Sequence, residues 1–198
     1  MRRPLCWCSR GKYPCWPATL PKPTASLNWH CDETRTTLKR NGWWGNAACG
    51  LCYEGLAWIT GAAVMAMGQW PDGRSLALAL LYSLGAHGIM TLNDFKSIPG
   101  DQQMGIRSLP VMLGARRAAQ VASAVMALPQ VVVIGLLASW GQGGYALAVA
   151  GLLAVQLLMM RRFIAQPIQR ALWYSGAGVP LYVSGMLVSA FALRGVMA

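Results

Sequence analysis

Five apolar stretches of about 20 residues, separated by short charged segments, constrain this chain more than any other feature of its sequence. They cover about residues 47–68, 75–92, 118–140, 141–160 and 173–193. A bilayer core of about 30 Å is crossed by about 20 helical residues. Every backbone polar group inside that core must be paired, and a helix pairs them within one segment. The sequence therefore predicts an all-α integral membrane protein with about five transmembrane helices.

The charged residues support this interpretation and indicate an orientation. Only 12% of the residues are charged, against about 25% in an average soluble domain. With a cytoplasmic N-terminus, the cytoplasmic side holds eight Lys and Arg before residue 47, four in residues 93–117 and three in residues 161–176, which leaves Arg74 and Arg194 outside. Basic residues at span ends contact lipid headgroups and set orientation. We therefore expect a lipid partner, no nucleic acid, and a cytoplasmic N-terminus.

Residues 1–38 differ from the rest of the chain. They contain scattered Pro, Arg, Trp and Cys without a helical or strand period. We interpret them as an unstructured tail or an artefact of a misplaced start, and residues 39–198 as the membrane domain. All six cysteines lie within the first 52 residues, and their spacing is not that of a zinc site. Free thiols are the expectation.

A polar segment follows the second apolar stretch and carries the candidate chemistry. His87 and Asp94 are seven residues apart, so a helix would place them on nearly the same face. We expect the helix to end near residue 92, and Pro99 and Gly100 to let a loop fold Asp101 back toward Asp94. Two carboxylates beside the cations Lys96 and Arg107 suit a diphosphate bridged by Mg²⁺. The residues alone leave an ordinary cytoplasmic loop in headgroup water equally open.

Motifs in this region resemble a known family. The segments Asn93-Asp94-Phe95-Lys96-Ser97, Gly100-Asp101 and Gly105-Ile106-Arg107-Ser108-Leu109-Pro110 look like the second aspartate-rich motif of the UbiA family of intramembrane prenyltransferases. The segments Asn41-Gly42-Trp43-Trp44-Gly45-Asn46, Leu51-Cys52-Tyr53-Glu54-Gly55-Leu56 and Gly85-Ala86-His87-Gly88 resemble the bacteriochlorophyll and chlorophyll synthase branch. The resemblance extends from about residue 38 to the end of the chain.

The resemblance implies an activity and a division of roles. It implies transfer of a geranylgeranyl or phytyl group from its diphosphate to the propionate carboxylate of bacteriochlorophyllide, with Mg²⁺ as cofactor, in the inner or intracytoplasmic membrane. By position, Asp94 and Asp101 would bind the metal, Lys96 and Arg107 would neutralise phosphate charge, and Asn93 would contact the substrate. The family pattern has an acidic residue where this chain has Pro99 and a basic residue where it has Gln102, which would weaken metal and phosphate binding.

Three further residues are candidates for substrate binding. His87 would contact the pigment magnesium or the diphosphate, or else form an ordinary hydrogen bond between helices, which the residues favour. Glu54 is the sole carboxylate inside a predicted span, so it is a functional candidate as well as a candidate for a structural ion pair. Its neighbour Tyr53 belongs to the segment that favours a pigment substrate.

The resemblance also implies that part of the bundle is missing. Family members have about nine spans and a first aspartate-rich motif, whereas five spans without that motif would correspond to the C-terminal part of the bundle. We expect this chain alone to lack appreciable transferase activity and to need the N-terminal half as a partner. Two alternatives stay open: a quinone-type aromatic prenyltransferase, and a catalytically silent membrane protein that binds pigment or assembles with other spans.

Overall fold

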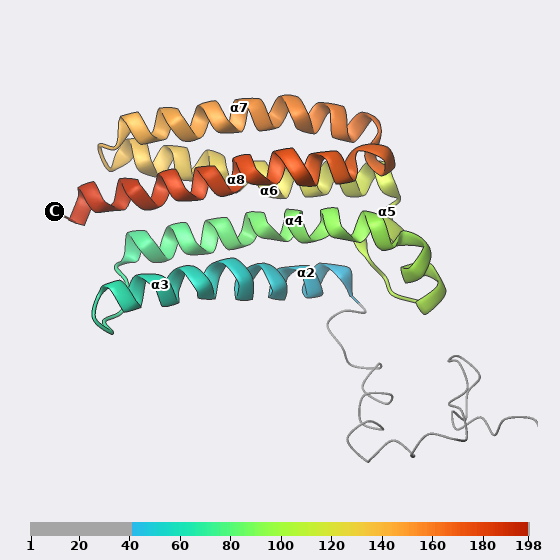
Figure 1. The fold of residues 1–198 in the computed structure, drawn as a ribbon, viewed down its shortest axis with the longest axis horizontal. Helices are drawn as coiled ribbons and strands as arrows, with labels where there is room; N and C mark the ends of the chain where they lie inside the picture. The colour runs from blue at the N-terminus through green and yellow to red at the C-terminus, as the bar shows by residue number, and fades with distance from the viewer. Residues whose placement is uncertain (1–40, 198) are drawn as a thin grey trace, which may run out of the picture. The chain divides into compact units, whose positions relative to one another are not determined.

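The computed structural model describes residues 41–197, with side chains through Arg194. The expectations for residues 1–38 lie outside this part of the chain. The described residues form five long rods joined by short connections (Figure 1). The first rod comprises α2 (Gly42–Gly50), the π-helix η3 (Leu51–Leu56) and α3 (Ala57–Met65), and the others are α4 (Gly73–Met104), α6 (Ala115–Ser139), α7 (Gly143–Ala165) and α8 (Pro167–Met197), with the short α5 (Leu109–Leu113) between α4 and α6.

All five rods are long and apolar enough to cross a membrane, which confirms the predicted all-α membrane fold. The rod boundaries differ from the apolar stretches. The first rod begins at Gly42 rather than at residue 47, because the Asn41 side chain accepts a hydrogen bond from the Trp43 N–H at 3.1 Å and caps the helix. The fifth begins at Pro167 rather than at residue 173, since proline suits the first turn of a helix.

The largest correction concerns α4, which does not end near residue 92. It continues to Met104 with Pro99 inside it, and stops where Gly105 adopts a left-handed conformation with φ 67°. Proline removes one backbone donor, and this one lies near the helix end, where neighbouring polar groups can satisfy the carbonyl that loses its partner. The expected loop that would fold Asp101 back onto Asp94 is therefore absent. The two residues lie on one helix, separated by about 10 Å along its axis.

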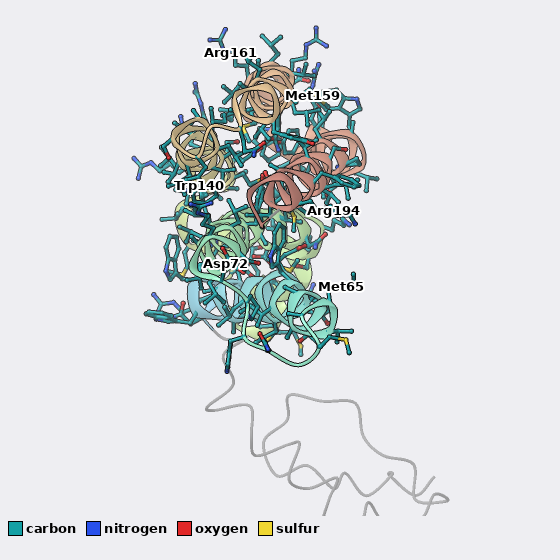
Figure 2. The ribbon with its side chains drawn as sticks, turned by 90° about the vertical axis from the view of Figure 1, so that its left-hand side faces the viewer. Met65, Asp72, Trp140, Met159, Arg161 and Arg194 are labelled. Carbon is teal, nitrogen blue, oxygen red and sulfur yellow. The ribbon has the colours of Figure 1, made fainter. Side chains whose placement is uncertain are left out.

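Helix α4 is the centre of the packing. Viewed along the helices, α4 lies between the first rod on one side and α6 and α8 on the other, with α7 outermost (Figure 2). The buried share of the most apolar 18-residue segment differs between spans. It is 67% in α4 and only 11% in the first rod. A Cβ added at Gly85 of α4 would collide with the Tyr182 ring of α8, and the Tyr182 hydroxyl donates to the Tyr82 carbonyl at 2.6 Å. Small residues thus allow close helix contact, as is usual in membranes.

A buried polar network joins α6, α7 and α8. The Gln130 amide donates to the Gln156 side-chain oxygen at 2.8 Å and to the Met126 carbonyl at 2.9 Å. The Gln156 amide in turn donates to the Gly178 carbonyl at 3.2 Å. Both glutamines are fully buried. Because lipid offers no alternative partner, these bonds hold the three helices in one register.

The two ends of the bundle differ in charge. The turns between α3 and α4 and between α6 and α7, together with the C-terminal end of α8, lie at one end (Figure 1). Among the described residues, this end carries two basic residues, Arg74 and Arg194. The opposite end carries seven, which are Lys96, Arg107, Arg116, Arg117, Arg161, Arg162 and Arg170. We refer to this opposite end as the basic end.

Candidate functional site

Asp94 lies at the basic end, where α2 packs against α4. The Asn46 side-chain amide donates to Asp94 Oδ2 at 2.9 Å and to Thr91 Oγ1 at 3.3 Å. The Thr91 hydroxyl donates to the His87 carbonyl at 3.0 Å. Asp94 is half-buried, so its carboxylate borders both the helix contact and the surface. The first rod therefore holds the side chain of the first candidate metal ligand.

His87 lies two turns before Asp94 on the same face of α4, as its spacing predicts. Its Nε2 is 3.0 Å from the Trp43 carbonyl oxygen, so this nitrogen carries the proton and donates. The centroid of its ring is 4.5 Å from that of the Trp43 indole. His87 is buried, and the bond corresponds to the alternative of a hydrogen bond between packed helices. Its Nδ1 is buried without a partner in the described part of the chain.

Asp101, the second candidate metal ligand, lies in the last turn of α4, and only 7% of its surface is exposed. The Ser97 hydroxyl lies between the two acidic positions, 3.0 Å from Asp101 Oδ2 and 3.2 Å from the Asp94 carbonyl oxygen. Because an ionised carboxylate only accepts hydrogen bonds, Ser97 is the donor to Asp101. Seven helical residues, about 10 Å along the axis, separate the two acidic positions, whereas Mg²⁺–oxygen bonds are about 2.1 Å long.

The candidate phosphate-binding residues lie on the exposed surface of the same region. The Lys96 ammonium donates to Asn93 Oδ1 at 3.4 Å, and both side chains are exposed. Arg107 is exposed in the connection between α4 and α5. Its carbonyl accepts a hydrogen bond from the Gly42 N–H at 3.0 Å, and its backbone pairs with Asn41 in an isolated bridge. The start of α2 therefore fixes the backbone that carries Arg107.

Glu54 and Tyr53 lie apart from this cluster, in the π-helix η3. A Cβ added at the adjacent Gly55 would meet the Ser83 hydroxyl, and Ser83 precedes Asp94 by eleven residues on α4, or about 16 Å along the helix. Glu54 is half-buried, and Tyr53 is 72% exposed on the outside of the first rod. The structure thus does not bring these two candidates next to the acidic residues.

Sequence reasoning overlooked two residues that contact the acidic side chains. In the sequence, Asn46 and Ser97 stand out only as members of segments that resemble the family. Asn46 is an amide inside a rod that is long and apolar enough to span the membrane, and polar groups in such segments need partners. The predicted span begins at residue 47, so hydropathy places Asn46 just outside it and gives no such signal. Its partner depends in turn on the register of α2 against α4.

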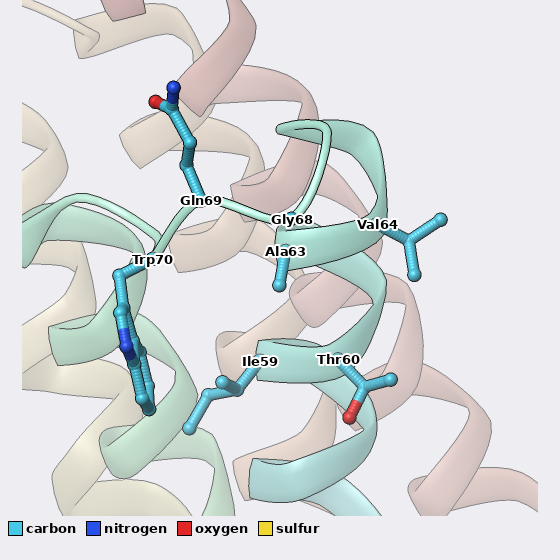
Figure 3. Close-up of a pocket in the computed structure, with 7 residues that line it drawn as sticks. All are labelled: Ile59, Thr60, Ala63, Val64, Gly68, Gln69 and Trp70. Atoms are coloured by element: carbon cyan, nitrogen blue, oxygen red, sulfur yellow. The ribbon is translucent and has the colours of Figure 1, made fainter.

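A cavity at the other end of the bundle is remote from these residues. It has a volume of about 370 Å³ and lies where the last turns of α3 meet the connection to α4 (Figure 3). Its lining is mostly apolar and comprises Ile59, Thr60, Ala63, Val64, Gly68, Gln69 and Trp70. It contains no acidic or basic side chain, so it lacks the groups that a diphosphate would require.

The donor set at the basic end suits a metal-bound anion rather than a metal bound by protein alone. Among the described residues, no three His, Cys, Asp or Glu side chains gather closely enough to hold a metal ion. Mg²⁺ normally takes one or two carboxylates and completes its shell with water and phosphate oxygens. Oxygen donors from Asp94, Asp101 and Asn93, with Lys96 and Arg107 nearby in sequence, fit this pattern. The residues of this stretch are thus of the chemical types that a magnesium diphosphate requires.

Comparisons with known proteins agree with this chemistry. The model of the UbiA prenyltransferase family matches residues 34–193. The bacteriochlorophyll synthase 33 kDa chain of Cereibacter sphaeroides is 54% identical over 80% of this chain and 52% of its own length. The bacteriochlorophyll synthase 34 kDa chain of Chloroflexus aurantiacus is 50% identical, over 78% and 49%, and the chloroplastic chlorophyll synthase of Oryza sativa is 38% identical, over 78% and 41%. The chain spans about half the length of the curated relatives it matches. No solved structure gives a significant match.

Proposed function

Because this chain belongs to the UbiA prenyltransferase family, we propose that it supplies the second aspartate-rich part of a bacteriochlorophyll synthase. The reaction is the transfer of a geranylgeranyl or phytyl group from its diphosphate to the carboxylate of bacteriochlorophyllide. The identities of 54% and 50% to bacteriochlorophyll synthase chains support this choice of acceptor. A polypeptide that supplies the other half of such a synthase is the proposed partner, since this chain matches about half the length of its relatives.

The acidic face of α4 is the observation that carries the proposal. Asp94 and Asp101 lie at the basic end of an otherwise apolar bundle, and separate donors hold their side chains. An isoprenoid diphosphate has the same division as the bundle, with an apolar chain and a highly charged head. Its head would lie at the basic end, and its chain would extend along the apolar spans.

The roles of the residues follow from charge. Asp94 would hold Mg²⁺ directly, and Asp101 would act on a second ion or through water, because about 10 Å of helix separates them. Bound Mg²⁺ would stabilise the negative charge that develops on the departing diphosphate. Lys96 and Arg107 would neutralise the remaining phosphate charge, Lys as a point charge and Arg as a planar fork. Asn93 would contact the metal-bound diphosphate, and its Oδ1 accepts a hydrogen bond from the Lys96 ammonium at 3.4 Å. The acceptor carboxylate is already ionised at neutral pH and requires no base.

The orientation follows from the same residues. We place the basic end in the cytoplasm, because seven of the nine described Lys and Arg residues lie there and the positive-inside rule puts such residues on that side. A water-soluble diphosphate head would then reach Asp94 from the cytoplasm. The membrane is the inner or intracytoplasmic membrane, where bacteriochlorophyllide would be available. His87, Glu54 and Tyr53 remain candidates for contacts with the pigment.

A transferase assay in membranes tests the proposal. Membranes would contain this chain alone, or this chain together with the N-terminal half of the Cereibacter sphaeroides relative, and would receive geranylgeranyl diphosphate, bacteriochlorophyllide and Mg²⁺. We expect esterified pigment with the pair, little with this chain alone, and loss with Asp94→Ala. Equal product with and without Asp94, or no product from the pair, would contradict the proposal. An aromatic acid that competed better than the pigment would favour a quinone-type acceptor.

A further inference from the structure

We propose that Asn46 is a positioning residue that orients the Asp94 carboxylate for the cation and diphosphate. The inference rests on the proposed function of Asp94, and it adds a residue from a different helix to the site. Asn46 would not touch the substrate. It would act by fixing the direction in which Asp94 presents its oxygens.

The hydrogen bonds define the donor without ambiguity. The Asn46 side-chain nitrogen is 2.9 Å from Asp94 Oδ2 and 3.3 Å from Thr91 Oγ1. An ionised carboxylate accepts only, so the amide nitrogen must face Asp94. The Thr91 hydroxyl gives its own proton to the His87 carbonyl, and its oxygen is therefore open to the second Asn46 hydrogen. Both amide hydrogens thus have acceptors on α4.

Asn46 is itself held by the packing of α2 on α4. Trp43, Asn46 and Gly50 lie three and four residues apart, so they share one face of the rod. Before Asn46, the Trp43 carbonyl accepts from His87. After Asn46, Gly50 packs so closely that an added Cβ would lie 2.7 Å from the Ser83 carbonyl oxygen. Contacts on both sides of Asn46 therefore fix the position along the α4 axis at which its amide contacts α4.

This arrangement has a functional consequence because a metal ligand benefits from a fixed direction. A carboxylate can rotate about its last torsion, and a hydrogen bond to one oxygen stops that rotation. Such outer contacts to metal ligands typically change metal affinity by about ten- to a hundredfold. A carboxylate oxygen has two lone pairs, so the Asn46 bond uses one of them and does not itself exclude a cation. Helix packing alone would not require the amide to be aimed at the acidic side chain.

The test measures Mg²⁺-dependent binding of geranylgeranyl diphosphate in lipid nanodiscs that hold the full chain together with the N-terminal half of the Cereibacter sphaeroides relative. The variants are Asn46→Ala and Asn46→Leu, the latter because leucine keeps the side-chain size and suits an apolar span. Gln120→Ala is the control, since it removes an exposed amide from the basic end. Unfolding temperature without Mg²⁺ is recorded in parallel. We expect both Asn46 variants to raise the Mg²⁺ concentration for half-maximal binding about tenfold, and Gln120→Ala to leave it unchanged.

The other outcomes separate this inference from the proposed function. If Asp94→Ala abolishes binding while the Asn46 variants keep the wild-type Mg²⁺ dependence, the positioning role is wrong and the proposed function stands. If the Asn46 variants lower the unfolding temperature without moving the Mg²⁺ dependence, Asn46 is a packing residue and the inference is overturned. If the wild-type chain shows no Mg²⁺-dependent binding, or Asp94→Ala binds equally well, the proposed function fails and the inference fails with it.

Discussion

Replacing Gly50 with alanine probes the contact that brings the first rod to α4. Gly50 has ordinary helical angles, φ −58° and ψ −44°, so alanine is compatible with its backbone. The added Cβ would lie 2.7 Å from the Ser83 carbonyl oxygen and 3.2 Å from the His87 nitrogen, both of them main-chain atoms. Neither atom can rotate away. The two helices must therefore separate, or the substitution is not tolerated.

The magnitude follows from a comparison with Gly61 on the same rod. Nothing lies within 4 Å of a Cβ added at Gly61. Gly61→Ala should therefore gain about 0.5–1 kcal/mol from helix propensity alone. Gly50→Ala has the same gain but also a steric cost of about 1–3 kcal/mol. Subtracting one variant from the other cancels the propensity gain, so the difference between them is the steric cost.

The assay is reversible unfolding of the chain in mixed micelles, with dodecyl sulfate as denaturant and circular dichroism as the signal. We expect Gly50→Ala to be less stable than Gly61→Ala by about 1–3 kcal/mol in free energy of unfolding. Equal stabilities would refute the reasoning, because they would mean that α2 does not approach α4 as closely as the structure has it. The arrangement of Asn46 against Asp94 would then lose its support.

Two further predictions concern other contacts. Gln156→Leu removes hydrogen bonds to α6 and α8 and should lower the free energy of unfolding in the same micelle assay by about 1 kcal/mol; an unchanged or higher stability would show that the network contributes nothing. Gly42→Ala places a Cβ 2.7 Å from the Ser108 Cα and should displace the backbone that carries Arg107, weakening geranylgeranyl diphosphate binding severalfold at saturating Mg²⁺. Wild-type affinity in that variant would remove Arg107 from the phosphate site.

The five spans could be predicted because membrane solvation acts on each segment by itself. Apolar length alone identifies a spanning helix, and the distribution of Lys and Arg places its ends. The rod ends were less predictable. Polar and capping residues such as Asn41 extend helices into the interface, where hydropathy gives no signal.

The error in α4 shows where local rules fail. Pro99 followed by Gly100 is a strong break signal, yet the helix continues through both residues and ends at Gly105. The unfavourable helix propensity of one proline is therefore not enough to end this long helix. The consequence for the site is direct, because Asp94 and Asp101 are spaced along one helix rather than folded together.

Contacts between distant segments could not be predicted from the sequence. The acidic residues, Lys96 and Arg107 were identified as candidates from their chemistry and from the family resemblance. That Asn46 donates to Asp94, 48 residues away, depends on how two helices are set against each other. Glycines at the contact, such as Gly50, set that register, and only the folded chain reveals which residues then meet.

The most direct test of the central claim replaces Mg²⁺ with Mn²⁺ and measures its magnetic coupling to phosphorus in bound geranylgeranyl diphosphate. The wild-type chain, reconstituted in nanodiscs with the N-terminal half of the Cereibacter sphaeroides relative, should bind Mn²⁺ with a ³¹P hyperfine coupling, which requires metal and diphosphate to be in contact. The coupled signal should disappear in Asp94→Ala and weaken in Asp101→Ala. An unchanged ³¹P coupling in the double variant would place the metal elsewhere and contradict the assignment of the acidic face of α4.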